Sequence, residues 1–299
     1  AMVREILVHL TWKFALIQAA SKDFCAFDFG SYFSNGAKPI FMNRASFRRM
    51  IQMPTIVVLV KQVPDTNAKI VVQGDRVDLS SVKMVMSPYD EFAIETAIRH
   101  KEATDGTVTA LTVGGPGSEK ILKDAKAIGV DNIVRVWDDS WSELDSNALQ
   151  SILSETIQTM GATVVYCGKS AADTGAGSTG PGLAERLGWG NASNVIGAEF
   201  TDSVVVSMPV ESGVAKISVA LPAVISCDKG DFKVRKPNVK GIMMAKKAKV
   251  ELLSATAPSS SINIASHSMP PAKPAGKTFE GGASASQVAQ LLRDEANVL

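Results

Sequence analysis

The residues best suited to chemistry in this sequence form a glycine-rich segment in its middle. A β-branched apolar run over residues 163–167 is followed by a loop of Gly, Ser, Thr and Asp, and a segment of helical character begins near Thr179. A strand, a glycine-rich loop and a helix N-terminus together offer free backbone N–H groups to a phosphate. Gly175, Gly177 and Gly180 also match the G-x-G-x-x-G pattern of dinucleotide-binding proteins. The segment therefore predicts a nucleotide site.

The glycine pattern alone does not indicate NAD. In NAD-binding domains the first glycine follows the first strand almost directly, whereas seven residues separate Cys167 from Gly175 here. The loop also belongs to the fourth predicted strand–helix unit rather than the first. Glu199 lies about twenty residues further on, where a ribose-binding acid is expected, but it falls in a predicted antiparallel strand. We therefore interpret the NAD match as a coincidence of spacing.

No catalytic constellation can be assembled from the sequence. His9, His100 and His267 are isolated, and His100 is predicted to be solvated at the charged end of a helix. Cys167 ends a buried strand, where a cysteine is more often a core residue than a nucleophile. No spacing of His, Cys, Asp or Glu indicates a metal site. A nucleotide-binding fold without acid–base machinery favours a carrier or binding subunit over an enzyme.

The elements that must position the glycine loop alternate between strands and helices from residue 53 onward. Four such alternations imply right-handed crossovers and a doubly wound, mostly parallel α/β sheet of Rossmann-like type. Ligands of such sheets bind at the carboxyl ends of the strands, where the loops after Val63, at 114–117 and at 168–178 begin. The strands are predicted over 55–63, 107–113, 133–137 and 163–167, and the helices from Pro88, from an N-cap at Ser118 to about Ile128, from Asp145 to Met160, and from Thr179.

The sequence changes character after Trp189. Short strands follow, several of which suit antiparallel hairpins, and then come a basic segment and a tether rich in Ser, Pro, Ala and Gly. A short amphipathic helix, capped near Ser286, closes the chain, and on so long a tether it is expected to pack on a partner subunit. The short strands are predicted over 195–200, 204–208, 215–220 and 224–226, the basic segment over 235–253, and the tether over 254–285.

Composition narrows the class of partner. Lys and Arg number 31 against 30 Asp and Glu in 299 residues, and this balance argues against nucleic acid as the main partner. The three cysteines are scattered, with no disulfide framework, which suits a reducing compartment. No apolar run reaches the length of a membrane-spanning helix, so no direct membrane insertion is expected.

Residues 1–52 are expected to be an N-terminal extension with no assigned function. Arg44, Arg48 and Arg49 suit a mitochondrial transit peptide, but the segment also carries acidic residues. The alternative interpretation, which we favour, is an over-extended reading frame or a cloning remnant, with the protein proper beginning at Met53. The predicted domains are then this extension, a nucleotide-binding α/β domain over 53–253, and a tether with its helix over 254–299.

Several segments together resemble the β subunit of electron transfer flavoproteins. The resemblance implies an αβ heterodimer that carries FAD, bound mainly by the α subunit. It also implies an electron carrier rather than an enzyme, moving electrons from acyl-CoA-type dehydrogenases in fatty acid β-oxidation to a membrane-linked quinone oxidoreductase. The segments are VVLVKQVPDTNAKI (57–70), SPYDEFAIETAIRHKE (87–102), VVYCGKSAADTGAGSTGPGLAERLGW (164–189), LPAVISCDKG (221–230) and RKPNVKGIMMAKKAKVE (235–251).

The resemblance also implies that the β subunit holds a structural AMP, and that Thr66 lies where the β subunit approaches the flavin. Ser87 stands where the family usually has Asn, and Thr174–Gly177 lack the usual polar side chains, so phosphate contacts are expected to rely on backbone groups. The AMP site maps onto Leu59, Ser87, Pro88, Tyr89, Asp90, Val113, Asp173, Thr174, Gly175, Ala176, Gly177, Ser178, Thr179, Gly180, Pro181, Gly182, Leu183 and Ala184.

A recognition loop at 235–249 is the segment that the resemblance assigns to docking on acyl-CoA dehydrogenases. Val239 stands at the position where a Leu is familiar. Exposed apolar residues surrounded by charge suit an adaptable docking surface, although a charged run is as often a solvated face. The docking residues are expected to be Val239, Lys240, Ile242, Met243, Met244, Lys246 and Lys247.

Three alternatives differ from this expectation. In a bifurcating electron transfer flavoprotein a second FAD takes the place of AMP. An NAD-dependent dehydrogenase would use the glycine pattern and a catalytic acid–base pair. A stand-alone nucleotide-binding module would need neither the basic segment nor the tethered helix. The expected compartment is the cytoplasm of a prokaryote, or otherwise the mitochondrial matrix.

Overall fold

The computed structural model describes residues 53–141, 144–201, 203–273 and 275–298, and the backbone of two short strands before them. Those strands, β1 (Phe24–Phe27) and β2 (Ile40–Asn43), pair in antiparallel fashion. The rest of residues 1–52, and both interpretations of that segment, lie outside the described residues.

The chain forms two compact units. One contains residues 1–68 and 82–263, and the other contains residues 69–81 and 264–299. The second unit therefore combines an insertion near the start of the α/β region with the C-terminal arm. The domain boundaries expected after residues 52 and 253 stay a prediction.

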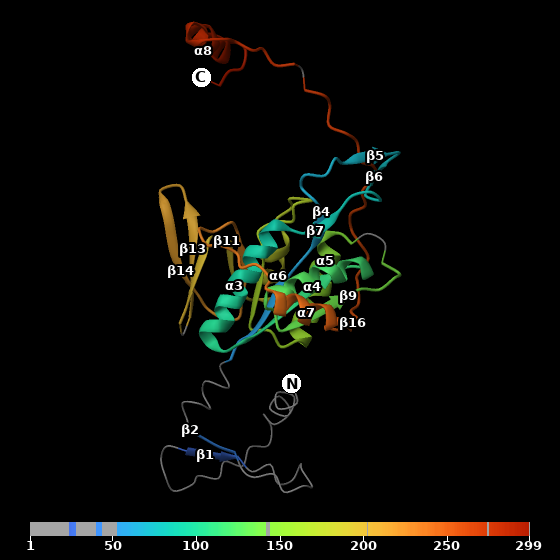
Figure 1. Cartoon of the computed structure of the whole chain (residues 1–299), viewed down its shortest axis with the longest axis vertical. Helices are drawn as coiled ribbons and strands as arrows, with labels where there is room; N and C mark the ends of the chain where they lie inside the picture. Colours follow the sequence, from blue (N-terminus) through green and yellow to red (C-terminus); the bar gives the residue numbers. More distant parts are fainter. Residues whose placement is uncertain are drawn as a thin grey trace. The chain divides into compact units, whose positions relative to one another are not determined.

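A parallel sheet forms the centre of the first unit (Figure 1). Ile56 and Val58 of its first strand join one buried apolar cluster, whereas Val57 and Leu59 join another. Since successive strand residues point to opposite faces, both faces of the sheet are covered. This confirms the predicted fold class. Among the described residues the order is β11 (Gly190–Val195), β15 (Ala223–Cys227), β10 (Val164–Gly168), β3 (Thr55–Leu59), β8 (Thr107–Val113), β9 (Asn132–Val136) and β16 (Glu251–Leu253), with every neighbouring pair parallel.

Helices cover both faces of this sheet. On one face, α3 (Pro88–Thr104) and α4 (Glu119–Ile128) bury Ile94, Ile98, Ile121 and Leu122 against the strands. On the other, α5 (Ser146–Thr159) and α6 (Thr179–Leu187) contribute buried residues to the second cluster. Asp145 caps α5 by accepting a hydrogen bond from the N–H of Ala148 at 2.8 Å. The helices predicted from Pro88, Asp145 and Thr179 are confirmed within a residue.

The strand order reverses direction beside β3. Along the chain, β8 and β9 follow β3 on one side, while β10 and β15 lie on the other. This places a topological switch point between β3 and β10, and ligands of such sheets bind beyond the carboxyl ends of the strands at this point.

Three predictions about strands were wrong in part. The predicted strand 55–63 is two elements, β3 and β4 (Gln62–Pro64), and β4 pairs with β7 (Met84–Met86) instead of continuing in the sheet. The predicted strand 195–200 is also divided, because Val195 ends β11 and β12 begins at Gly197. The segment 224–226, grouped with the short strands after Trp189, belongs to β15 in the parallel sheet.

A separate three-stranded antiparallel sheet packs beside α3. It contains β12 (Gly197–Phe200), β13 (Val204–Val210) and β14 (Gly213–Val219). Val204, Val206 and Val219 are buried in the same apolar cluster as α3. The antiparallel hairpins expected in this region are therefore present over 197–219.

The basic segment was expected to be a loop, but its centre is a helix. α7 (Val239–Lys247) begins after Asn238, whose side chain accepts a hydrogen bond from the N–H of Gly241 at 2.8 Å. Its single buried residue, Ala245, packs toward α4. A Cβ on Gly241 would lie 2.3 Å from the carbonyl oxygen of Ala127, so only glycine permits this approach.

Ser118 holds the N-cap position of α4 as predicted, but neither α4 nor the C-terminal helix has a side-chain capping bond. Ser118 precedes α4, but its hydroxyl donates to the carbonyl oxygen of Gly115 at 2.7 Å and closes a short 3-10 turn, η2 (Pro116–Ser118). The C-terminal helix α8 (Ala285–Asp294) begins before Ser286 and follows a second such turn, η3 (Gly282–Ser284). Ser284 precedes it without a side-chain capping bond.

His100 was expected to be solvated, and this was wrong. Only 3% of the residue is exposed, its Nδ1 lies 2.9 Å from the hydroxyl oxygen of Tyr166, and its ring stacks on Phe200 at 4.5 Å between centroids. It joins α3 to β10 and β12. Burial lowers the pKa of His100 from 6.5 to about 4.

The second unit consists of a hairpin and the C-terminal arm. β5 (Val71–Gln73) pairs with β6 (Arg76–Asp78), and the arm contacts this hairpin near residues 264–267 before it continues to α8. Among the described residues, no helix of either unit is long and apolar enough to cross a membrane.

Candidate functional site

The carboxylate of Asp90 joins two strand ends at the switch point. One oxygen, Oδ2, accepts a hydrogen bond from the N–H of Lys61 at 2.7 Å, and Oδ1 accepts one from the N–H of Gly168 at 3.1 Å. Lys61 lies just after β3, and Gly168 ends β10. A Cβ at Gly168 would lie 2.5 Å from Oδ1, so this residue must be glycine for the carboxylate to fit. Asp90, in the first turn of α3, thus sets the spacing of the two loops.

Burial also changes the acidity of Asp90. It raises the pKa of the carboxyl group from 3.8 to about 7, although the N–H groups of Lys61 and Gly168 both favour the charged form. Perturbed carboxyl groups are frequent at functional sites, but structural networks produce them too. Here both oxygens are occupied by backbone donors, so the geometry supports a positioning role.

The glycine loop uses backbone conformations that favour glycine. Gly175 and Gly177 have φ angles of +62° and +64°, in the left-handed region that favours glycine. The N–H of Gly175 donates to the carbonyl oxygen of Ala171 at 2.8 Å, and Asp173 forms an ion pair with Lys61 at 2.7 Å. The loop is therefore shaped by its own backbone and held to the end of β3.

The N-terminus of α6 faces this loop with unused donors. Ser178 precedes the helix without a side-chain capping bond, and none of the hydrogen bonds within the described part of the chain uses the N–H of Thr179 or Gly180. A Cβ on Gly180 would lie 3.1 Å from Sγ of Cys167, so this glycine lets α6 pack closely on β10. A helix N-terminus with free N–H groups suits an anion.

A buried hydroxyl lies at the start of α3. Ser87 is fully buried, and its Oγ has no hydrogen-bond partner among the described residues. Its backbone N–H donates to the carbonyl oxygen of Lys61 at 3.0 Å, which fixes it at the same edge. Buried polar atoms normally have a partner, so this hydroxyl is available to a polar group of a ligand.

Contacts join three loops at this edge, but the first of them begins directly after β3 and not after Val63 as predicted. Gln62 donates through Nε2 to the carbonyl oxygen of Gly117 at 2.9 Å, which joins the loop after β3 to the loop after β8. The Lys61–Asp173 pair joins it to the glycine loop. The expected AMP-site residues accordingly share one edge: Leu59 ends β3, Val113 ends β8, Ser87–Asp90 begin α3, Asp173–Ser178 form the loop and Thr179–Ala184 begin α6.

Sequence reasoning missed three charged residues at this edge. Lys169 pairs with Asp228 at 2.9 Å, and its ammonium group lies 4.8 Å from the ring centroid of Tyr89. Lys61 is the third of these charged residues. Each of the three lies within two residues of the carboxyl end of a strand, and this position in the sequence could have predicted that they belong to the site.

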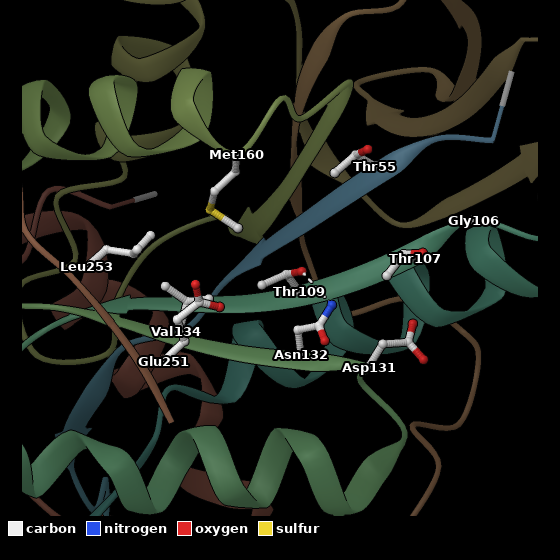
Figure 2. Close-up of a pocket in the computed structure, with 10 residues that line it drawn as sticks. All are labelled: Thr55, Gly106, Thr107, Thr109, Asp131, Asn132, Val134, Met160, Glu251 and Leu253. Carbon is white, nitrogen blue, oxygen red and sulfur yellow. Dashed lines mark hydrogen bonds between the residues drawn. The ribbon is translucent and has the colours of Figure 1, made fainter. Parts of the chain in front are cut away.

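The cavity drawn in Figure 2 lies at the opposite ends of the strands. Its volume is about 540 Å³, and its lining includes Thr55, Thr107 and Glu251, each of which begins a strand. The carboxylate of Asp131 in its wall already accepts from Lys101 at 2.5 Å and from the N–H of Val108 at 2.9 Å. The cavity therefore plays no part in the candidate nucleotide site.

Comparison with known proteins identifies the family of this chain. A family model described as the electron transfer flavoprotein domain matches residues 76–258. The electron transfer flavoprotein subunit beta of Bacillus subtilis (strain 168) is 33% identical over 254 residues, which cover 81% of this chain and 98% of that protein. The chain belongs to the electron transfer flavoprotein β-subunit family. This confirms the resemblance noted in the sequence, and it makes the chain an electron-carrier subunit rather than an enzyme.

Two further relatives are an electron transfer flavoprotein β subunit and a subunit with another name. A β subunit from Dictyostelium discoideum is 33% identical over 66% of this chain and 80% of that protein. The acryloyl-CoA reductase electron transfer subunit gamma of Anaerotignum propionicum is 34% identical over 63% of this chain and 73% of that protein. The family therefore includes carriers with more than one named role, and the chain's own donor and acceptor are matters for proposal.

The residues present fit the phosphate of a nucleotide cofactor. The N–H groups of α6, the backbone of the glycine loop and the hydroxyl of Ser87 are uncharged donors at one edge. Lys61 and Lys169 lie at the same edge, and each is paired with an aspartate. Asp173 is the carboxylate of the loop, and its ion pair with Lys61 reduces the repulsion of an anion.

The remaining expected site residues lie elsewhere in the first unit. Thr66 is exposed in the turn after β4. The expected docking residues all lie on α7, where Val239 is 75% exposed and Met243 is 59% exposed. Their helical arrangement presents apolar side chains together with Lys246 and Lys247 in the last turn.

Proposed function

We propose that this chain is the β subunit of a heterodimeric carrier in which its glycine loop binds AMP and an α subunit binds most of the FAD. The flavin supplies the redox chemistry when bound. The residues of this chain hold the nucleotide, with Thr66 near the flavin, and present α7 to acyl-CoA-type dehydrogenases. A membrane-linked quinone oxidoreductase is the proposed electron acceptor.

One observation carries the AMP proposal. Free N–H groups at the start of α6 face a loop whose left-handed glycines leave its backbone accessible, at the switch point of the sheet. The loop lacks acidic or basic side chains at residues 174–178, so phosphate contacts would come from backbone groups. The buried Oγ of Ser87 is a candidate partner for the ribose or base.

Two other cofactors would use the same edge. A second FAD is the main alternative, because its ADP portion carries the same adenosine phosphate group. NAD is the weaker alternative: a dehydrogenase needs a proton-transferring residue, and His100 is enclosed between Tyr166 and Phe200 rather than at this edge.

The decisive experiment is mass spectrometry of nucleotides released from the purified heterodimer. We expect one FAD and one AMP. Two FAD molecules would establish the bifurcating type, NAD would favour the dehydrogenase, and an absence of AMP and of a second flavin would refute a nucleotide site on this chain.

A matched pair of variants tests whether the glycine loop holds the nucleotide. Gly175 and Gly188 have φ angles of +62° and +64°, and a Cβ at either would meet nothing within 4 Å. Gly175→Ala and Gly188→Ala should therefore cost about 1 kcal/mol of stability each through backbone strain. Only Gly175→Ala should weaken AMP binding, by about fivefold if binding must restore that strained conformation. Equal AMP affinity in the two variants would count against the loop.

A further inference from the structure

The segment that connects β15 to α7 lies along one face of α3. Phe232 of this segment packs edge-on against Phe92, with 5.7 Å between the ring centroids, and the guanidinium group of Arg99 lies 4.4 Å from the centroid of Phe232. Phe92 and Arg99 have the i, i+7 spacing that places both on one face of the helix. Residues 228–238, which we call the strap, are therefore attached to α3 before α7 begins.

Arg235 makes the strongest of these attachments. Its Nε donates to Oε2 of Glu95 at 2.8 Å, and its Nη1 donates to Oε1 of Glu102 at 2.7 Å. Its Nη2 donates to both carboxylates, at 3.2 Å to Glu95 and at 3.1 Å to Glu102, and its backbone N–H donates to Glu95 at 3.1 Å. The planar fork of arginine makes such paired bonds specific. We call this arrangement the Arg235 latch.

The charges around the latch are balanced within the chain. Glu95 is only 3% exposed, and it also accepts a hydrogen bond from Nε of Arg99 at 2.7 Å. Two arginines therefore face two glutamates, Glu95 and Glu102, and the group has no net charge to offer another protein. Breaking a buried ion pair is costly, so Glu95 favours the closed latch. Arg235 accordingly acts inside the chain rather than as a contact for a partner.

The chain between the latch and α7 is short and stiff. Only Lys236 and Pro237 separate Arg235 from Asn238, the N-cap of α7. Proline fixes its own φ and restricts the residue before it. The helix itself packs slightly, since Ala245 is its single buried residue, and its C-terminal end leads to β16, which pairs with β9 in the sheet. The latch therefore fixes the end of α7 that the sheet does not.

We propose that Arg235 is a positioning residue for docking: its latch on Glu95 and Glu102 holds α7 in the orientation in which the exposed apolar side chains of this helix contact the dehydrogenase. The inference rests on the docking role of α7 in the proposed function. A surface that is ordered before the encounter avoids the entropy cost of ordering it. Loss of the latch weakens the encounter and leaves the electron-transfer step within the complex unchanged.

Steady-state kinetics with the purified heterodimer as the substrate of an acyl-CoA dehydrogenase test this proposal. For Arg235→Gln we expect a KM for the heterodimer about fivefold higher, with kcat within about twofold of the wild type. Lys233→Gln is the matched control, because Lys233 is an exposed residue of the same strap, carries the same charge and lies outside the latch; its KM should change less than about twofold. An unchanged KM in Arg235→Gln, or an equal increase in the control, would overturn the proposal.

A variant on α3 distinguishes positioning from direct contact. Glu102→Gln removes one carboxylate of the latch from a helix that carries none of the expected docking residues, and the side chain is 56% exposed, so the fold should tolerate the change. It should raise the KM, and the double variant Glu102→Gln/Arg235→Gln should have the KM of Arg235→Gln alone. Arg235→Lys, whose ammonium group can pair with one carboxylate, should have an intermediate KM. A wild-type KM in Glu102→Gln, or additive effects in the double variant, would mean that Arg235 does not act through α3.

Hydrogen exchange and Val239→Asp separate the possible failures. The amides of residues 235–241 should exchange about tenfold faster in the Arg235→Gln heterodimer than in the wild type, and unchanged exchange would overturn the latch. If Val239→Asp raises the KM but Arg235→Gln does not, the latch fails and the docking role of α7 stands. If neither variant raises the KM, that docking role in the proposed function fails, and the positioning role fails with it.

Discussion

The buried His100 makes a prediction about how stability depends on pH. Its pKa is lowered from 6.5 to about 4 in the folded protein, because burial disfavours the charged imidazolium. Between these values the unfolded chain binds more protons than the folded one, so folding stability falls as the pH falls. The folding stability that comes from keeping His100 neutral is fully present above pH 6.5. It is lost progressively as the pH falls to about 4.

The size of this loss follows from the two pKa values. At pH 5 the unfolded histidine is almost fully protonated while the folded one is about 10% protonated, which gives a loss of about 2 kcal/mol relative to pH 8. This is a large fraction of the stability of a typical domain. His100 is only 3% exposed, so solvent screening reduces the value little.

Two variants isolate this effect in urea denaturation at pH 8 and pH 5. His100→Gln can keep a hydrogen bond to the hydroxyl of Tyr166 but cannot be protonated, so its loss between the two pH values should be about 2 kcal/mol smaller than that of the wild type. Tyr166→Phe serves as the control, since it lowers stability at both pH values by about 1–3 kcal/mol but leaves a titrating histidine.

A direct NMR titration of His100 can refute this reasoning. Imidazole-selective NMR of the wild-type protein should show the pKa of His100 well below 6.5. A measured value near 6.5, together with parallel pH profiles for the wild type and His100→Gln, would mean that the imidazole is solvated after all. The junction of α3, β10 and β12 would then be open to water.

Two further predictions concern α7. A Gly→Ala change inside a helix usually stabilises a protein. Gly241→Ala should instead destabilise this protein by about 1–3 kcal/mol in thermal denaturation, because the new Cβ would lie 2.3 Å from the carbonyl oxygen of Ala127. A higher Tm would disprove this close approach. Val239→Asp should leave the Tm within about 1 °C, since Val239 is 75% exposed, and should slow electron transfer from an acyl-CoA dehydrogenase about tenfold. Val214→Asp, on the 58% exposed Val214 of β14, is its control, and equal rates in the two variants would remove α7 from the docking surface.

The elements predicted best are those whose pattern has a single physical cause. β8 occupies 107–113 as predicted, because a segment rich in β-branched residues and flanked by glycines suits a strand. α5 was predicted from its helical spacing, and Asp145 caps it. The glycine loop was predicted from its composition, and Gly175 and Gly177 have the left-handed backbone that this composition permits.

The elements that were missed depend on contacts between distant segments. β11 reads GNASNV, which has no apolar run, and it is a strand because β15 pairs with it and because Ala192 and Val195 are buried. α7 contains a glycine and follows a proline, and its helix depends on the cap at Asn238 and on packing against α4. His100 lies among charged neighbours, and the residues that enclose it come from β10 and β12. No local pattern reports these partners.

The contacts that join the three loops have a consequence for the exchange kinetics of the proposed nucleotide. Asp90, the Lys61–Asp173 pair and the Gln62–Gly117 bond hold the loops at the carboxyl edge without help from a ligand. Their backbone is ordered when the chain folds, so a nucleotide that enters has little left to order. Its departure would likewise leave the edge intact, and the residence time would depend on the nucleotide's own contacts. A site built in this way can retain its ligand through many cycles of electron transfer as a permanent part of the subunit.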